Sequence, residues 1–87
     1  MHYYVYILTC ADSTLYTGIT NDLESRIAAH NSGKGAKFTR SRIPVVLTYQ
    51  ELCENKSAAL RREIEIKKMT REEKLHLVAQ GRPYLPR

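Results

Sequence analysis

The segment from Tyr3 to Arg26 constrains the fold of this chain more than any other part of it. Residues Tyr3 to Thr9 are rich in aromatic and β-branched side chains, which favour a strand. A break of short polar residues covers 10–14, and a second apolar run covers 15–20. Because so short a connection joins antiparallel neighbours, the segment predicts a β-hairpin.

The hairpin brings two tyrosines near each other. Side chains alternate along a strand, so Tyr4, Tyr6 and Leu8 share one face of the first strand. Tyr6 and Tyr16 can then lie close across the pair, and Gly18 interrupts the second run. A glycine inside a strand often marks a close approach by a ligand or another backbone. The simpler interpretation is that both tyrosines are ordinary packing residues of a hairpin.

The order of the remaining elements predicts an α+β fold. We expect a helix at 22–32, a loop at 31–42, a strand at 44–52, a helix at 57–69 and a helix from Thr70. The order strand, strand, helix, strand, helix, helix predicts a small, largely antiparallel three-stranded sheet flanked by helices. The 87 residues make a single domain, 1–87, in which 81–87 is expected to be a loose C-terminal tail.

The spacing of apolar residues predicts which side chains face the core. The expected core-facing residues of the helices are Leu23, Ile27, Leu60, Ile64, Leu75, Val78 and Ala79, and Ile66 and Met69 extend the apolar surface of the helix at 57–69. In the third strand, Val45, Leu47 and Tyr49 are expected to share one face. Asn21 is the expected N-cap of the first helix, with Glu24 three residues later. Thr70 and Glu73 have the capping-box spacing. The last two helices are expected to form a helical hairpin, and Gly81 to end the second of them.

The composition favours a cytoplasmic protein that binds a polyanion. The formal net charge is +5 and the pI is about 9.4, as in many domains that bind nucleic acid. No apolar run approaches the length of a membrane span, and no signal peptide opens the chain. Its two cysteines do not make a disulfide framework. A merely soluble basic protein remains the alternative.

The loop at 31–42 carries much of this positive charge. Its basic residues, with no acidic residue among them, are Lys34, Lys37, Arg40 and Arg42. They can contact phosphates, while Phe38 offers a surface on which a base can stack. In the simpler interpretation the loop is solvated and Phe38 packs into the core.

The order of several short motifs resembles the GIY-YIG endonuclease family. Tyr4-Val5-Tyr6, ahead of Tyr16-Thr17-Gly18, is similar to the two signature tripeptides of that family. Arg26 and His30 match its Arg-x-x-x-His helix, and Glu63 matches its metal-binding glutamate. The resemblance covers nearly the whole chain and is strongest to small single-domain bacterial members. Both signature tyrosines are present, although a tyrosine stands for the first glycine, and valine and threonine stand for the two isoleucines.

The resemblance implies a catalytic role for each matched side chain. It implies that Tyr6 is the general base or orients the water, and that Tyr16 supports it. Glu63 would hold one divalent cation, Mg²⁺ or Mn²⁺, which needs only one or two protein carboxylates. Guanidinium matches phosphate geometry, so Arg26 is the expected clamp on the substrate. His30 would hydrogen-bond a tyrosine or the phosphate.

Two further expectations concern the rim of this site. Gly18 would let the backbone approach it, and Lys67 would tune Tyr6 or contact DNA. In the simpler interpretation Glu63 and Lys67 are only an i,i+4 ion pair on a helix. Larger family members carry a further polar residue, often asparagine, late in the domain, and none of the asparagines here can be assigned to it.

Taken together, these features predict a metal-dependent endonuclease that cleaves DNA with low sequence specificity. The low specificity is expected because phosphate contacts position a strand without reading its sequence. Single-stranded or structured DNA is the expected substrate, because a small isolated site with aromatic side chains suits accessible strands. A DNA-repair or recombination protein is an alternative route to the substrate. The alternative function is a nucleic-acid-binding module of the same fold that cleaves weakly or not at all.

Overall fold

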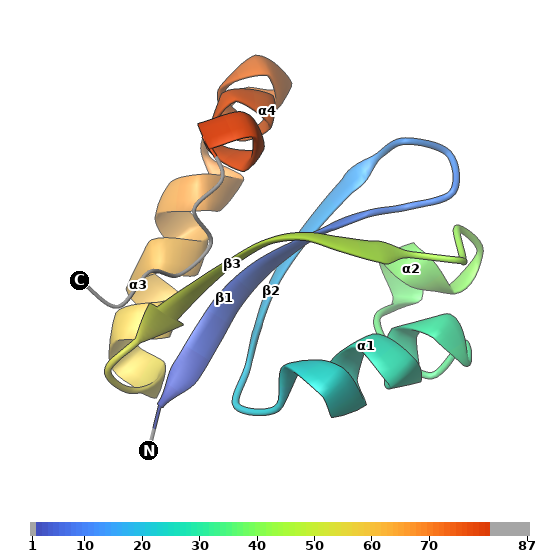
Figure 1. Ribbon diagram of the computed structural model, residues 1–87, viewed down its shortest axis with the longest axis horizontal. Helices are drawn as coiled ribbons and strands as arrows, with labels where there is room; N and C mark the ends of the chain where they lie inside the picture. Colours follow the sequence, from blue (N-terminus) through green and yellow to red (C-terminus); the bar gives the residue numbers. More distant parts are fainter. Residues whose placement is uncertain (1, 81–87) are drawn as a thin grey trace.

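A three-stranded antiparallel sheet with helices on both sides forms the body of the molecule (Figure 1). The computed structural model describes residues 2–80. Strand β1 (Tyr3–Thr9) lies between β2 (Leu15–Thr20) and β3 (Val46–Cys53). The helices are α1 (Leu23–Asn31), α2 (Lys37–Arg40), α3 (Lys56–Lys67) and α4 (Arg71–Gln80). The predicted α+β fold and strand arrangement are therefore confirmed.

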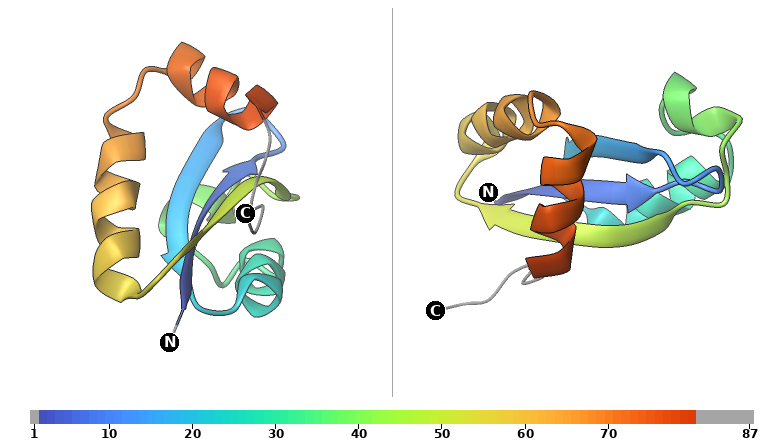
Figure 2. Two further views of the ribbon diagram at one scale, coloured as in Figure 1. Left: turned by 60° about the vertical axis from the view of Figure 1, so that its left-hand side comes forward. Right: turned by 90° about the horizontal axis from the view of Figure 1, so that it is seen from above.

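Each face of β1 supports its own core. Helices α1 and α3 lie on opposite sides of the sheet (Figure 2). The core on the α3 side contains the buried residues Val5, Ile7, Tyr49, Ala59 and Ile66. The core on the α1 side contains Tyr6, Leu8, Cys10 and Val45, with Leu23 and Ile27 packed against them. The alternation predicted for β1 is thus correct, and Tyr6 belongs to the α1 side.

A β-bulge in β3 overturns the alternation predicted for that strand. Ile7 pairs with Tyr49, but its neighbour Leu8 pairs with Leu47, so Thr48 is the extra residue. The bulge places Tyr49 in the core on the α3 side, whereas Leu47 packs on the α1 side. The prediction that both side chains share one face was wrong, because one inserted residue reverses the side-chain phase.

Helix α3 packs against the sheet through only part of the apolar surface predicted for it, since Ile66 is buried as expected but Leu60 and Ile64 are not. Leu60 and Ile64 are 40% and 54% exposed, whereas Ala59 and Ile66 are fully buried. The two buried residues are seven apart and so lie on one face of the helix. The small side chain of Ala59 permits the helix to approach the strands closely. The helix therefore packs through Ala59 and Ile66, and the larger apolar residues Leu60 and Ile64 face away from the sheet.

The cap residues follow the predicted chemistry, with one shift. Asp22, rather than Asn21, caps α1, and its side chain accepts a hydrogen bond of 3.2 Å from the backbone N–H of Ser25. Two adjacent residues with similar capping preference made this boundary ambiguous. The capping box before α4 is confirmed: Glu73 N–H donates to the Thr70 hydroxyl, and Thr70 N–H donates to the Glu73 carboxylate.

Helix α4 differs from the prediction in its buried side and its direction. Leu77 and Val78 pack against the core, whereas Leu75 and Ala79 are exposed. The helix turns steeply away from α3 and does not form a helical hairpin with it (Figure 2). The expected helix end at Gly81 and the tail at 81–87 lie outside the described residues. No helix within 2–80 has the length and apolarity to cross a membrane.

Candidate active site

Tyr6 lies directly over Gly18 of the neighbouring strand. The two residues are paired in the register of β1 and β2, and the Tyr6 side chain is 1% exposed. A Cβ atom at position 18 would lie 2.6 Å from the Tyr6 hydroxyl oxygen and 3.2 Å from Cε2 of Tyr16. The close neighbour that the strand glycine predicts is therefore the ring of Tyr6.

Three aromatic rings from three elements meet above this glycine. The centroids of Tyr6 and Tyr16 are 6.4 Å apart, and the His30 ring lies 6.0 Å from the first and 5.2 Å from the second. The Tyr6 hydroxyl and Nε2 of His30 are joined by a hydrogen bond of 3.0 Å. The β1–β2 hairpin and helix α1 thus bring the two predicted tyrosines and the predicted histidine together.

Arg26 and Glu63 act electrostatically on the same cluster. The pKa of Tyr6 is raised overall: burial is the largest cause, and the neighbouring Arg26 guanidinium opposes it in part. The neighbouring Tyr16 and the negative charge of Glu63 raise the same pKa further. Burial lowers the pKa of His30, and the Arg26 charge lowers it again, so the imidazole is neutral at neutral pH.

Glu63 has the surroundings of a single metal-binding carboxylate and also of an ion pair. Its side chain is 16% exposed and lies 3.3 Å from the ammonium of Lys67, which is 54% exposed. Within 2–80 no three His, Cys, Asp or Glu side chains are grouped to hold a metal ion. A hard cation such as Mg²⁺ retains several waters and binds substrate oxygens, so one accessible carboxylate is a suitable protein ligand.

Thr39 is a member of the cluster that the sequence did not reveal. Its hydroxyl lies 2.7 Å from Nδ1 of His30, and both residues are 0% exposed. Gly35 lies beside the same ring, where a Cβ atom would be 2.6 Å from Cγ of His30. A buried histidine needs partners on its ring nitrogens, but that rule does not say which residue supplies them.

Phe38 lies between Tyr16 and Arg42, and Arg42 forms an ion pair with Asp12 in the turn of the hairpin. Its ring stacks on Tyr16 with centroids 5.9 Å apart, and Cζ of Arg42 lies 4.0 Å from the ring centroid. Nε of Arg42 lies 3.1 Å from a carboxylate oxygen of Asp12. Hydrogen bonds from Thr14 and the charge of Arg42 lower the pKa of Asp12. At 39% exposed, Phe38 lies at the rim of the site rather than in the core.

The predicted phosphate-binding residues divide into two groups. Lys34, Lys37 and Arg40 are exposed, and the last two flank the buried Thr39 on α2, a one-turn helix inside the expected loop. Arg42 and Lys67 are engaged with Asp12 and Glu63. The first group therefore presents the more available positive charge.

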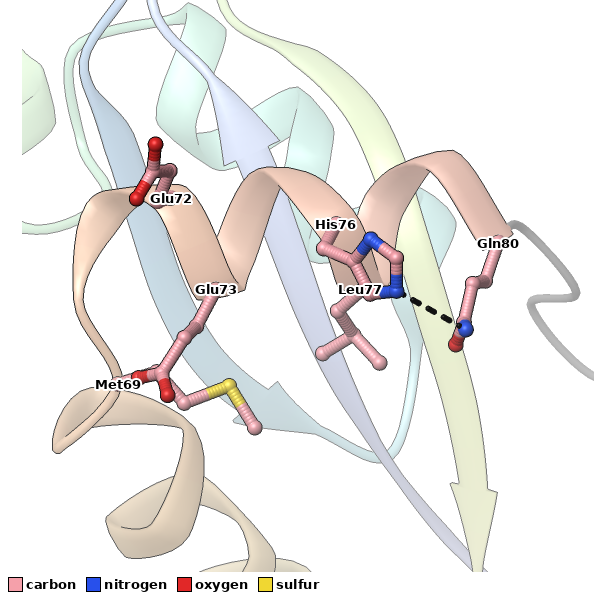
Figure 3. A pocket seen from close by; sticks show the side chains of 6 residues that line it. All are labelled: Met69, Glu72, Glu73, His76, Leu77 and Gln80. Atoms are coloured by element: carbon pink, nitrogen blue, oxygen red, sulfur yellow. Dashed lines mark hydrogen bonds between the residues drawn. The ribbon is translucent and has the colours of Figure 1, made fainter.

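A separate groove of about 520 Å³ lies along α4 (Figure 3). Its lining residues are Met69, Glu72, Glu73, His76, Leu77 and Gln80. The groove contains none of the predicted site residues. The tyrosine cluster belongs to the other face of the sheet, where α1 packs.

The fold and the cluster define a GIY-YIG-type domain. The family model of the GIY-YIG catalytic domain matches residues 2–76, and the chain belongs to this family. Membership of this family indicates nuclease-like chemistry.

Similar proteins include UPF0213 protein SH2523 of Staphylococcus haemolyticus, which is 55% identical over 90% of this chain and 95% of its own length. UPF0213 protein NP_0776A of Natronomonas pharaonis is 54% identical over 88% and 91% of the two chains. The solution NMR structure of UPF0213 protein BH0048 from Bacillus halodurans has a TM-score of 0.62 and 46% identity, covering 93% of this chain and 86% of that one.

Proposed function

We propose that the chain is a divalent-metal-dependent endonuclease that hydrolyses DNA phosphodiester bonds. The observation that carries this proposal is the convergence of Tyr6, Tyr16 and His30, with Arg26 acting on two of them and Glu63 acting on Tyr6. These side chains come from β1, β2, α1 and α3. Core packing alone does not require a buried histidine, an arginine and a carboxylate around a tyrosine hydroxyl.

In the proposed reaction, Tyr6 acts as the phenolate: its own proton is first lost to solvent, and its oxygen then accepts a proton from the attacking water. The water oxygen forms a bond to phosphorus, the phosphorus–oxygen bond to the departing strand breaks, and the departing oxygen takes a proton from solvent. Tyrosine is a weak base at neutral pH, with an ordinary pKa near 10. Burial raises the pKa of Tyr6 above that ordinary value, and the Arg26 guanidinium offsets part of the rise. The same guanidinium can bind a non-bridging phosphate oxygen.

Tyr16 and Glu63 complete the proposed site. Tyr16 lies against both Tyr6 and His30, where its hydroxyl can orient the water or the phosphate. Glu63 would hold the divalent cation, Mg²⁺ or Mn²⁺. When bound, such a cation offsets negative charge on the phosphoryl and departing oxygens.

The basic residues support DNA as substrate without a sequence preference. Lys34, Lys37 and Arg40 are exposed and lie in the segment that packs on His30. Lysine and arginine contacts to phosphates position a strand but do not read its bases. Single-stranded or structured DNA would bring an accessible phosphate to a site whose rim carries Phe38.

The ion pair between Glu63 and Lys67 favours one alternative. If the pair persists with substrate bound, the carboxylate is not free for a cation, and the domain would bind nucleic acid without efficient cleavage. A DNA-repair or recombination protein would then be needed to complete the activity.

A nicking assay tests the proposal. Labelled single-stranded, duplex and branched DNA would be incubated with the wild type and with Glu63→Ala and Tyr6→Phe, in Mg²⁺, in Mn²⁺ and in a chelator. We expect metal-dependent cleavage that falls by at least about 100-fold in both variants, as for loss of a group that acts in the transition state.

Matched controls separate chemistry from folding. Glu65→Gln changes an exposed carboxylate two positions from Glu63, and Tyr3→Phe removes a hydroxyl from the other face of β1. Both are expected to cleave like the wild type. Tight binding without cleavage in either metal would contradict the nuclease proposal and support the binding module, and cleavage that survives Glu63→Ala would contradict the assignment of the metal ligand.

A further inference from the structure

We propose that the segment from Gly35 to Thr39 holds His30 as the tautomer with its proton on Nε2, so that His30 donates its hydrogen bond to the Tyr6 oxygen. Thr39 is then a positioning residue, which acts on Tyr6 through His30. The tautomer is inferred from the hydrogen-bond geometry around His30 alone, whereas its consequence for catalysis rests on the proposed nuclease function.

The two nitrogens of His30 have different partners. Nε2 lies 3.0 Å from the Tyr6 hydroxyl oxygen, and Nδ1 lies 2.7 Å from the Thr39 hydroxyl oxygen. The ring is fully buried, so no water competes for either nitrogen. A neutral imidazole has one N–H and one acceptor nitrogen, and a hydroxyl can serve either role. The two hydroxyls therefore do not decide the tautomer by themselves.

The backbone N–H of Ala36 decides it. This N–H is directed at Nδ1 of His30, with a nitrogen-to-nitrogen distance of 3.5 Å. The hydrogen bond is long, but a backbone N–H can only donate, and a protonated Nδ1 would face it with a second hydrogen. Gly35 permits this approach, because a Cβ atom there would overlap the ring. Nδ1 is accordingly the acceptor, and the proton lies on Nε2.

The Thr39 hydroxyl has two possible acceptors for its one proton, the Ala36 carbonyl oxygen and Nδ1 of His30. It lies 3.1 Å from the Ala36 carbonyl oxygen as well as 2.7 Å from Nδ1. That carbonyl already accepts the backbone N–H groups of Thr39 at 3.2 Å and Arg40 at 3.1 Å. The Thr39 proton can therefore be given to Nδ1 of His30, so that both donors beside this nitrogen, the Thr39 hydroxyl and the Ala36 N–H, face an acceptor.

The consequence for Tyr6 is that its oxygen receives a hydrogen bond. His30 donates to it, and the positive charge of Arg26 lowers the pKa of Tyr6 in part. Burial, Tyr16 and Glu63 act in the opposite direction. Donors to a phenolic oxygen favour its charged form. His30 and Arg26 thus make Tyr6 a better proton acceptor than its burial alone would allow.

Nitrogen-15 NMR of the full chain reads the tautomer directly. At neutral pH, long-range ¹H–¹⁵N correlations of the His30 ring are expected to show a protonated Nε2 and an unprotonated Nδ1. Comparison with His30→Gln would assign the signals. A protonated Nδ1 in the wild type would overturn the proposal, and this result needs no variant of Thr39 and no nuclease activity.

Thr39→Val and Thr39→Ser test the positioning role. Valine retains the shape of threonine without its hydroxyl, and serine retains the hydroxyl. With tyrosine ¹³Cζ shifts as readout, we expect Thr39→Val to mix the two tautomers and move Tyr6 ionisation to higher pH, and Thr39→Ser to behave like the wild type. Equal Tyr6 titrations in a folded Thr39→Val would refute the role of Thr39. Absence of cleavage by the wild type would refute only the nuclease function.

Discussion

The contact between Gly18 and Tyr6 predicts that Gly18→Ala lowers the free energy of unfolding, although the same substitution in an unobstructed strand usually raises it. Alanine in an unobstructed strand is more stable than glycine by about 0.5–1 kcal/mol. At position 18, however, the added Cβ atom would lie 2.6 Å from the Tyr6 hydroxyl oxygen and 2.8 Å from its Cζ. These distances are shorter than any stable contact, so the Tyr6 ring must move.

The expected loss of stability follows from the contacts that change. Forcing an extra methyl group into a packed core costs about 1–3 kcal/mol. Displacement of the Tyr6 hydroxyl also removes its hydrogen bond to His30, worth about 0.5–1.5 kcal/mol. After the gain in strand propensity is subtracted, Gly18→Ala should lower the free energy of unfolding by about 2 kcal/mol. For a domain of this size, that corresponds to a fall in Tm of roughly 8–16 °C.

Urea denaturation followed by circular dichroism would measure this loss. The substitution would also be made in a Tyr6→Leu background, where the atoms that clash are absent and the cost of Gly18→Ala should shrink. Gly33→Ala is the control: it has no atom within 4 Å of the added Cβ, and its φ of +82° predicts only backbone strain. A neutral or stabilising Gly18→Ala, or an equal cost in both backgrounds, would refute the reasoning.

Two further predictions concern the neighbours of this contact. The lowered pKa of His30 means that the unfolded chain binds its proton first, so the free energy of unfolding should fall as the pH falls below about 6.5, by at most about 1.4 kcal/mol per unit. Urea titrations between about pH 5 and 8 should show a smaller slope in His30→Asn, and equal slopes would contradict a buried neutral histidine. Phe38→Leu retains apolar bulk but loses the stacked contact with Tyr16, so it should cost roughly 1 kcal/mol in the same assay. An unchanged near-ultraviolet circular dichroism spectrum in Phe38→Leu would contradict the stacking.

The parts of the fold that depend on local pattern could be predicted from the sequence. The alternation in β1 and the short turn after it determine that Tyr6 and Tyr16 meet, because neighbouring strands of a hairpin leave few alternatives. The spacing of Arg26 and His30 likewise places both on one side of α1.

The features that were missed depend on contacts between distant segments. The bulge at Thr48 reverses the phase of β3, and nothing in a run of alternating apolar residues reveals one extra residue. In α3, the choice between the stripe of Ile64 and that of Ile66 depends on how closely the helix approaches the sheet. Thr39 contacts His30 only after the glycine-containing loop has folded back, so spacing along the chain could not identify the pair.

The hydrogen-bonded side chains of Tyr6 and His30 each pack directly against a glycine, Gly18 and Gly35 respectively. At either glycine an added Cβ atom would overlap the neighbouring ring. Any larger residue at these two glycines would therefore displace the ring that packs on it. Variants designed to alter the proposed activity should therefore leave Gly18 and Gly35 unchanged. Exposed positions such as Lys34 and Lys37 can be varied instead, because new side chains there extend into solvent.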